Sequence, residues 1–462
     1  MKSIRLCLMI LAMFLLLSAC AAPVETESVT VPTTAPPTEP PKADIGGTEI
    51  DCTVTELNLD EVEYDLDMLI QAFGQLKDLK RIDLGETSLR AGDLERLSAA
   101  YPDAEIEYAV KWQGLRLTKR AESLDLSAMK PEQTEELLGI LPMMPKLREI
   151  NLVDENGVCA FTLENLDELD MIRELCPDVY LRVSFDLFGQ TVTSEDERIE
   201  YYCVEIGNEG AEVVRRVLPY LRSCTYFLMD GCGIDYEILA QMREDFPQTK
   251  IVWRVWLMEE NYKTRKFLRC GSFLTDTHRI RTTYVNDRNS HVLNYCTETK
   301  YVDVGHVWAL TQCDFLSYMP DLEVCIIAIT EITDISPLAN HEKLEYLELF
   351  TTDIADISPL LTCPNIEHLN LSNMPYLDDI TPVFTLTKLK RLRMVDSPLI
   401  SEEEMQQAAE ALPDCEMLNA GHFATAGYWR WKDVNKEYKV ERYELLCEQM
   451  EYKKDYVEYG IP

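Results

Sequence analysis

Positive charge is scarce in this sequence of 462 residues. Lys and Arg together number 44 against 81 Asp and Glu, which leaves a formal net charge of −37. A nucleic-acid binder needs a dense face of Lys and Arg against the phosphates, so this composition excludes that class of partner. The same excess of acid argues against electrostatic binding of the chain as a whole to an anionic bilayer.

The residue patterns of common catalytic and cofactor sites are absent as well. The sequence contains no HExxH, GxSxG, GxxxxGK[ST] or GxGxxG motif, and its six histidines have no metal-ligand spacing. Neighbouring acidic residues are expected by chance among 81 carboxylates and do not define a catalytic pair. We therefore expect no enzyme, metal or cofactor, and an extracellular hydrolase that uses carboxylates stays as the enzymatic alternative.

A cysteine framework is also lacking. The fifteen cysteines form no CxxC pair and show no regular spacing. Several stand inside apolar runs, such as Cys203 and Cys325, where cysteine commonly serves as a small buried hydrophobic residue. The sequence predicts buried free thiols rather than a disulfide scaffold.

The first twenty residues carry the clearest local signal. Lys2 and Arg5 precede an apolar run from Leu6 to Leu17, which is too short to cross a bilayer and is typical of a signal peptide, here residues 1–19. The run ends in Leu-Ser-Ala-Cys, which resembles the lipobox of bacterial lipoproteins, in which the cysteine is acylated. The resemblance makes Cys20 the expected lipidation site, with an ordinary signal peptide and a chance cysteine as the alternative.

A Pro/Thr-rich segment follows this cysteine. Residues 21–43 contain six prolines, five threonines and three glutamates, and such a segment cannot bury a core. We expect residues 20–45 to form a lipidated stalk that raises a folded domain from the extracytoplasmic face of a bacterial cell membrane. The lipid is then the only membrane attachment, because no later stretch approaches the 18 apolar residues of a membrane-spanning helix.

Short repeats dominate the last third of the sequence. From Leu322, three segments of 22, 22 and 23 residues share an apolar start that follows the LxxLxL pattern, and two of them contain the element DISPL, at 334–338 and 356–360. The three starts read LEVCII, LEYLEL and IEHLNL. This pattern resembles the leucine-rich repeats of internalins, which implies one short parallel strand and one return segment in each repeat. Thr330 and Thr352 stand where that family usually has an asparagine.

A longer and fainter repeat runs through the first half. Strand-like triplets begin at Leu57, Leu124 and Val204, and each unit continues with helical and alternating apolar segments. Strands are mostly 23–26 residues apart, which is the leucine-rich-repeat period with helical returns.

These patterns predict an α/β fold: a curved leucine-rich-repeat solenoid with parallel strands on its concave face. Divergent helical repeats would occupy residues 46–257 and internalin-like repeats residues 301–417, and several small α/β domains in a row are the alternative. Residues 258–300 interrupt the pattern as an irregular connector. Its basic residues would either pair with acidic repeats or form a binding patch; they are Lys263, Arg265, Lys266, Arg269, Arg279 and Arg281.

The aromatic C-terminal segment, residues 418–462, is predicted to be a cap. It contains Tyr428, Trp429 and Trp431, and a terminal repeat needs a cover for its exposed core. We expect these side chains to pack on the end of the last repeat.

A candidate binding face follows from the repeat register. In LxxLxL repeats the leucines point inward and the intervening residues line the concave surface. The candidate ligand-binding residues lie in three rows across the strands: Tyr346, His368 and Arg391; Glu348, Asn370 and Arg393; and Phe350 with Ser372 and Val395. Aromatic and Arg side chains beside hydrogen-bonding groups are typical of a recognition surface, although ordinary solvated strand positions are the alternative.

Lipobox, stalk and DISPL repeats together resemble the leucine-rich-repeat surface lipoproteins of Clostridia-type bacteria. The resemblance covers most of the chain and implies a cell-surface module that binds an extracellular protein or glycan on its concave face. A structural envelope lipoprotein without a diffusible ligand is the alternative function, because fold alone does not define function.

Overall fold

The computed structural model describes residues 41–60, 62–261, 263–432 and 435–452, which divide after Thr118 into two compact units. The predicted signal peptide, Cys20 and most of the predicted stalk lie outside the described residues. The folded chain begins slightly earlier than residue 46. Strand β1 (Lys42–Ile45) pairs antiparallel with β2 (Thr48–Asp51) and buries Ala43 and Ile45.

The first unit contains a four-stranded sheet in the order β3-β4-β5-β6. Its strands are β3 (Glu56–Asn58), β4 (Arg81–Glu86), β5 (Glu105–Trp112) and β6 (Leu115–Thr118). The first three run parallel, and the connections between them contain α1 (Leu66–Phe73) and α2 (Ala91–Ala100). Asp65 caps α1 by accepting a hydrogen bond from the Met68 amide at 2.9 Å, which satisfies one of the free N–H groups at the helix start.

The second unit opens with the same plan twice. One sheet contains β7 (Ser123–Asp125), β8 (Glu149–Asn151) and β9 (Tyr180–Arg182), and the next begins with β12 (Arg198–Tyr202), β13 (Tyr226–Asp230) and β14 (Lys250–Glu260). Neighbouring strands are parallel. The returns contain the α-helices α3 (Thr134–Leu138), α4 (Leu166–Leu175), α5 (Gly207–Val217) and α6 (Tyr236–Asp245). The sequence prediction of helical returns in this region is correct.

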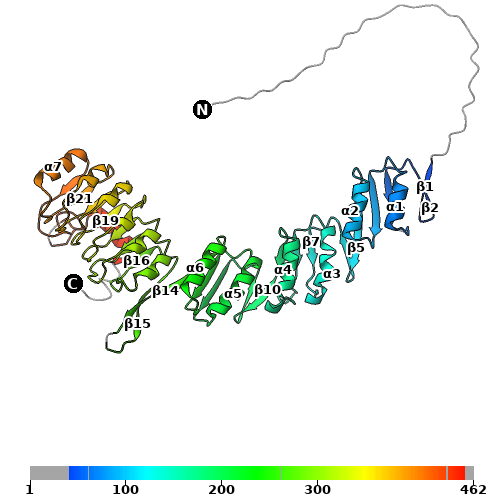
Figure 1. Ribbon diagram of the computed structural model, residues 1–462, viewed down its shortest axis with the longest axis horizontal. Helices are drawn as coiled ribbons and strands as arrows, with labels where there is room; N and C mark the ends of the chain where they lie inside the picture. Colours follow the sequence, from blue (N-terminus) through cyan, green and yellow to red (C-terminus); the bar gives the residue numbers. More distant parts are fainter. Residues whose placement is uncertain (1–40, 61, 262, 433–434, 453–462) are drawn as a thin grey trace, which may run out of the picture. The chain divides into compact units, whose positions relative to one another are not determined.

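Each of these three-strand groups is followed by an antiparallel hairpin. The first two hairpins, β5–β6 and β10 (Ser184–Leu187) with β11 (Gln190–Thr193), close with two-residue turns. Gln113–Gly114 and Phe188–Gly189 both have positive φ angles, as two-residue hairpin turns require. The third hairpin, β14 with β15 (Phe267–Leu274), is longer: β14 ends at Glu260, and β15 begins at Phe267, after the turn (Figure 1).

Seven parallel strands form the C-terminal sheet, which begins earlier than predicted. They are β16 (Arg279–Arg281), β17 (Tyr301–Asp303), β18 (Val324–Ile326), β19 (Tyr346–Glu348), β20 (His368–Asn370), β21 (Arg391–Arg393) and β22 (Glu416–Leu418). The prediction that residues 258–300 form an irregular connector is therefore wrong. It consists of the end of a hairpin, the first strand of this sheet, and the short helix η5 (Ser290–Tyr295).

The DISPL elements form 3₁₀ turns on the return side of the repeats. In η7 (Ser336–Leu338) and η8 (Ser358–Thr362) a proline occupies one of the first two positions. Asp334 and Asp356 accept the amide hydrogens of Ser336 and Ser358 at 2.7 Å. Each aspartate thus forms an Asx turn just before the 3₁₀ turn, and the proline fills a position that needs no amide donor.

The core of these repeats is the one that the sequence pattern predicts. Leu344, Leu347 and Leu349 are fully buried, and so are the return residues Ile354 and Leu360. The hydroxyl groups of Thr330 and Thr352 donate to the carbonyls of Ile327 and Leu349 at 2.7 Å. Each threonine therefore bonds within its own repeat.

The turn after each of five successive strands contains one residue in the left-handed region. These residues are His306, Ile329, Thr351, Asn373 and Asp396, with φ angles between 53° and 64°. Such angles are costly for β-branched side chains. The repeat geometry therefore places strain at Ile329 and Thr351.

All thirteen described cysteines are free thiols. Cys325 is buried, as predicted, whereas Cys203 is exposed and that prediction is wrong. Cys203 has a φ of 54° and follows the last residue of β12. Because the chain turns at this residue, its side chain does not point to the buried face of the sheet. Within the described residues, no helix is both long and apolar enough to span a bilayer.

Candidate functional site

The three predicted rows on the C-terminal sheet have the predicted register. Tyr346 pairs with His368 and His368 with Arg391, while Glu348 pairs with Asn370 and Asn370 with Arg393. The Glu348 row continues through Ile326 and Asp303 to Arg281. These side chains share the face of the sheet that points away from the leucine core, which we call the outer face.

The outer face is covered by the chain's own C-terminal segment, residues 419–432 and 435–452, so the prediction of an open ligand-binding surface there is wrong. Eight of the nine candidate residues are buried: Tyr346, Glu348, Phe350, His368, Asn370, Ser372, Arg393 and Val395. Arg391 alone is partly exposed, and its Nε donates to Glu416 of the next strand at 3.2 Å. Helix α8 (Glu441–Gln449) lies over this sheet and not beyond its last strand (Figure 1).

An apolar cluster joins the segment to the strands. Trp429, Tyr443 and Met450 pack with Tyr346 and Phe350 of the sheet. The cluster also includes Val324, Ile326, Ala328, Leu418, Ala424, Val440, Leu446, Cys447 and Tyr452. The predicted cap therefore exists, but it covers the outer face instead of the end of the last repeat.

The aromatic residues named for the cap have different roles. Trp429 is buried and Trp431 is partly buried against the cluster, whereas Tyr428 is more than half exposed. Tyr428 has a φ of 69°, so the chain turns between these neighbours and leaves its ring outside the cluster.

Glu348 is the centre of the polar contacts under this cover. Its side chain is 0% exposed and forms an ion pair with Arg430. Trp429 Nε1 and Arg430 Nε donate to Glu348 Oε1 at 2.8 and 3.0 Å, and the Tyr346 hydroxyl donates to the same oxygen. Burial alone would lower the pKa of Arg430, but the Glu348 charge outweighs it and holds that pKa well above its usual value.

Arg393 and Asn370 hold the start of the segment. The Arg393 guanidinium donates to the carbonyls of Leu418, Ala420 and Phe423, each at 2.8 Å. Asn370 Nδ2 donates to the Ala424 carbonyl at 2.9 Å. Burial lowers the pKa of Arg393, and the opposing charge of Asp396 offsets only part of this effect.

The other end of the segment is bound to the first strands of the sheet. The Tyr452 hydroxyl donates to Asp303, and the Arg281 guanidinium lies 4.8 Å from the centre of the Tyr452 ring. Arg279 pairs with Glu451 at 3.1 Å and donates to the Gln449 carbonyl at 3.2 Å. The segment therefore crosses the sheet from β22 back to β16.

A pocket of about 1040 Å³ lies beside the covered area, between β15, strands β16–β18 and the C-terminal segment. Hairpin β14–β15 supplies the stretch from Cys270 to Phe273, and the solenoid supplies Arg281, Tyr284, Asp303 and His306. Tyr284 and His306 are exposed. This pocket combines aromatic rings with charged groups of both signs, and its size suits a peptide or glycan segment.

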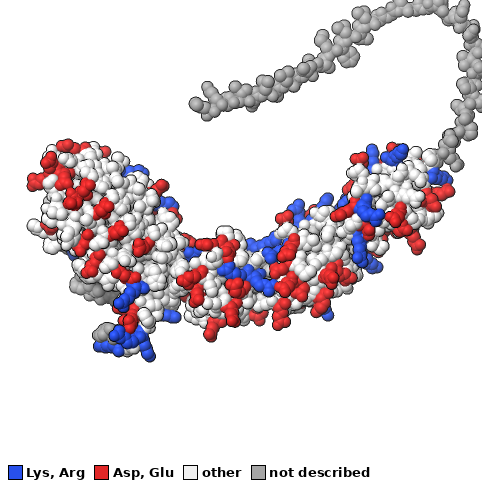
Figure 2. All heavy atoms as spheres, viewed as in Figure 1, with Lys and Arg blue, Asp and Glu red and all other residues white. Residues whose placement is uncertain are grey.

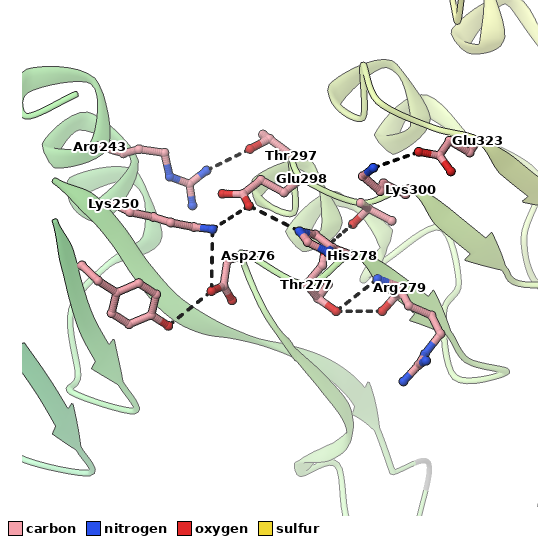
Figure 3. Close-up of polar contacts among 12 residues, drawn as sticks. Arg243, Lys250, Asp276, Thr277, His278, Arg279, Thr297, Glu298, Lys300 and Glu323 are labelled. Atoms are coloured by element: carbon pink, nitrogen blue, oxygen red, sulfur yellow. Dashed lines mark hydrogen bonds and ion pairs between the residues drawn. The ribbon is translucent and has the colours of Figure 1, made fainter. Parts of the chain in front are cut away.

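A second polar cluster joins the last helical unit to the short repeats (Figure 3). Lys250 lies between two carboxylates, 2.6 Å from Glu298 and 3.9 Å from Asp276. His278 lies 3.8 Å from Glu298, and Arg243 donates to the Tyr295 carbonyl at 3.1 Å. The adjoining pocket of about 260 Å³ is small. Because these charges are paired with each other, the cluster serves as a structural joint.

The basic residues of the predicted connector divide between two places. Arg279 and Arg281 lie on β16 and contact the C-terminal segment. Lys263, Arg265, Lys266 and Arg269 lie at the distal end of hairpin β14–β15. Within the described residues, no group of three or more His, Cys, Asp or Glu is placed to hold a metal ion.

The polar anchors of the C-terminal segment were missed by sequence reasoning. Glu348 and Arg430 are 82 residues apart, and no local pattern relates them. The one signal available was composition: the outer-face positions contain glutamate, asparagine and arginine in a single row, and the C-terminal segment is unusually rich in Tyr and Trp.

Comparisons with known proteins give only distant likenesses. No family model matches the chain, and no curated protein matches it. Among solved structures, internalin C2 of Listeria monocytogenes is 16% identical over 52% of this chain and 81% of its own, with a TM-score of 0.24. An internalin F of the same species is 16% identical over 80% and 83%, with a TM-score of 0.28.

A leucine-rich-repeat protein of Leptospira interrogans is 15% identical over 75% of this chain and 91% of its own, with a TM-score of 0.29. Likenesses at this level of identity and TM-score do not show the function of this chain. The fold stands on the strand order and register of the chain itself: it is an α/β leucine-rich-repeat solenoid with helical repeats followed by short internalin-type repeats.

Proposed function

We propose that the protein is a lipid-anchored binding module on the extracytoplasmic face of a bacterial cell membrane, and that it binds an extracellular protein or glycan. Cys20 carries the lipid in this proposal, and the Pro/Thr-rich segment acts as the stalk. The proposal includes no catalytic step and no cofactor.

The ligand site in this proposal is the pocket between β15, β16–β18 and the C-terminal segment. The observation that carries it is the contrast between the two parts of the outer face: the part over β18–β21 is filled by the C-terminal segment, whereas the pocket beside β16 and β17 is open. Tyr284 and His306 line this open part and are exposed. An aromatic ring and an imidazole beside Arg281 and Asp303 can stack on and hydrogen-bond to a peptide or sugar.

Binding can be tested with the chain from Ala21 to Pro462, without the lipid, against arrays of cell-wall glycans and extracellular peptides. Tyr284→Ala with His306→Asn should abolish the binding of any array member that the parent chain retains, because both side chains line the pocket. Asparagine tolerates the φ of 64° at position 306. The matched control is Trp308→Ala with Tyr318→Ala, two exposed aromatic residues of the same region that do not line the pocket.

Unchanged binding by the pocket variant would place the site elsewhere. A parent chain that retains no array member would instead favour the structural envelope lipoprotein. The anchor is tested separately. Cys20→Ala should release the protein from the membrane fraction or leave its signal peptide uncleaved, and normal cleavage with full membrane retention would contradict the lipoprotein assignment.

A further inference from the structure

The distal end of hairpin β14–β15 differs from the rest of the molecule in length, charge and polarity. We call this part, residues 258–261 and 263–269, the basic hairpin tip. The two equivalent hairpins in the preceding units end in two-residue turns, at Gln113–Gly114 and Phe188–Gly189. Here β14 continues to Glu260 and β15 begins only at Phe267, so the tip is an extension that the repeat architecture does not require.

The tip is cationic in a strongly acidic chain. Lys263, Arg265, Lys266 and Arg269 stand against Glu259 and Glu260, and four cations less two carboxylates leave +2, while the whole chain has −37. Arg265 pairs with Glu260 at 3.3 Å, and Arg269 lies 4.1 Å from the centre of the Trp256 ring. Figure 2 shows Lys and Arg gathered at the end of this hairpin, next to repeats in which acidic residues predominate.

Large apolar side chains accompany these charges. Phe267 is 65% exposed and Leu268 is 50% exposed. Phe267 pairs with Glu260 and Leu268 with Glu259, and consecutive strand residues point to opposite faces. The hairpin thus presents one apolar side chain on each of its two faces.

This arrangement distinguishes between kinds of partner. A flat protein surface laid against a two-stranded ribbon covers one face and leaves the other apolar side chain in water. End-first entry of the tip into the interfacial layer of a bilayer takes both side chains out of water, and the turn residues Lys263, Arg265 and Lys266 can reach the anionic headgroup phosphates through their long aliphatic stems. We propose that the basic hairpin tip inserts into the interface of an anionic lipid bilayer.

The acidic remainder of the chain does not prevent this contact. Leu257 is fully buried in the body of the protein, and the three residues from Met258 to Glu260 extend the strand by roughly 10 Å. Charges are screened over about 8 Å at physiological ionic strength. The acidic repeats therefore lie about one screening length or more from headgroups that the tip contacts, and each basic residue near the surface contributes favourably.

The test uses the chain from Ala21 to Pro462 without the lipid, so that any membrane binding must come from the folded part. Cosedimentation with vesicles of phosphatidylglycerol mixed into phosphatidylcholine should exceed that with pure phosphatidylcholine and should weaken as salt is added. Phe267→Ser with Leu268→Ser should reduce the partition coefficient by at least about tenfold. Arg265→Gln with Lys266→Gln should remove the preference for the anionic lipid.

A control pair matches these variants in exposure and chemistry. Leu399→Ser with Phe423→Ser replaces two residues that are also at least half exposed, outside the hairpin, and should leave vesicle binding unchanged. Equal binding by the parent chain and the Phe267/Leu268 variant would overturn the proposal. A parent chain that binds neither vesicle would also overturn the proposal, and it would indicate that the tip binds a pocket on a protein partner.

Insertion depth gives a second and independent measurement. Phe267→Trp keeps an aromatic ring at the tip, and brominated lipids should quench its added fluorescence in anionic vesicles. Tyr376→Trp, an exposed aromatic position on the short repeats, should show no added quenching. Equal quenching of the two reporters would contradict end-first insertion of the hairpin. Neither measurement uses the pocket residues, so the proposal stands or fails separately from the proposed ligand site.

Discussion

The carboxylate of Glu348 on strand β19 is paired with the guanidinium of Arg430 in the C-terminal segment, under a cover that leaves Glu348 with no exposed surface. The charge of Glu348 is satisfied by Arg430, Trp429 and Tyr346 together. A buried pair of this kind costs much desolvation free energy to form, and removing one partner leaves an uncompensated buried charge. The row of polar residues across the sheet therefore binds the chain's own C-terminal segment.

Arg393→Ala should destabilise the short repeats by about 3 kcal/mol or more, because the carbonyl of Leu418 in β22 and the carbonyls of Ala420 and Phe423 in the segment lose a charged donor. Urea unfolding of the chain from Ala21 to Pro462 measures this loss. Arg391→Ala is the matched control on the same strand: its partner Glu416 is half exposed, so we expect a change of about 1 kcal/mol or less. Equal effects of the two substitutions would contradict the anchoring role of Arg393.

Gly427 gives a related prediction at the same anchor. It has a φ of 59°, and a Cβ atom there would lie 2.7 Å from Arg393 Nη1 and 3.1 Å from the Ala420 carbonyl oxygen. Gly427→Ala should therefore weaken the Arg393 contacts and destabilise the segment by about 1–2 kcal/mol. Gly421→Ala, where the nearest atom is 3.6 Å away, has the strain of a positive φ without the close contact. A larger loss for Gly421→Ala than for Gly427→Ala would count against the anchor.

His368 should make the stability of the sheet depend on pH. Burial lowers the pKa of His368 to about 3, with smaller contributions from the positive charges of Arg442, Arg391 and Lys390. Between about pH 6.5 and pH 3 the unfolded chain binds a proton that the folded chain does not, so the free energy of unfolding falls as the pH falls. The His368 contribution to this loss should be roughly 1 kcal/mol between about pH 7 and pH 5.5.

Urea unfolding at several pH values measures that loss. His368→Phe should remove it, since the ring keeps its packing but no longer titrates. An unchanged slope in the His368→Phe variant would show that His368 is not buried in its neutral form.

Thr351→Asn should stabilise the short repeats by about 1 kcal/mol. Thr351 has a φ of 57°, and asparagine adopts the left-handed region more readily than a β-branched residue. The neighbouring Thr352→Ala should act in the opposite direction, because it removes the 2.7 Å hydrogen bond to the Leu349 carbonyl. Melting temperatures of the two variants provide the comparison, and a change of the same sign in both would contradict the assigned turn geometry.

The repeat pattern predicted most of the fold because each repeat is a local signal. Leucines at fixed spacing determine which residues face the core, and the DISPL elements specify a 3₁₀ turn. The register that aligns Tyr346 with His368 and Arg391 follows directly from the repeat length. The helical units were recognisable for the same reason.

The state of the outer face could not be predicted in this way. Its cover depends on contacts between Glu348 and Arg430, 82 residues apart, and between Asp303 and Tyr452, 149 residues apart. The same composition, aromatic rings beside Arg and hydrogen-bonding groups, suits a surface for a foreign ligand and a surface for another part of the same chain. An open surface would tolerate Tyr346→Ala and Arg393→Ala. Because the surface is covered, Tyr346→Ala removes packing against the C-terminal segment, and Arg393→Ala removes hydrogen bonds that hold the segment in place.

The coupling between Glu348 and Arg430 tests the central claim most directly. Hydrogen exchange of the α8 amides gives the free energy of local opening of the segment in the parent chain, Glu348→Gln, Arg430→Met and the double variant. If the segment occupies the outer face, the two single changes should be coupled by at least about 2 kcal/mol, as close buried charge pairs are. A coupling below about 0.5 kcal/mol, with α8 amides that exchange as fast as those of a free peptide, would contradict the account.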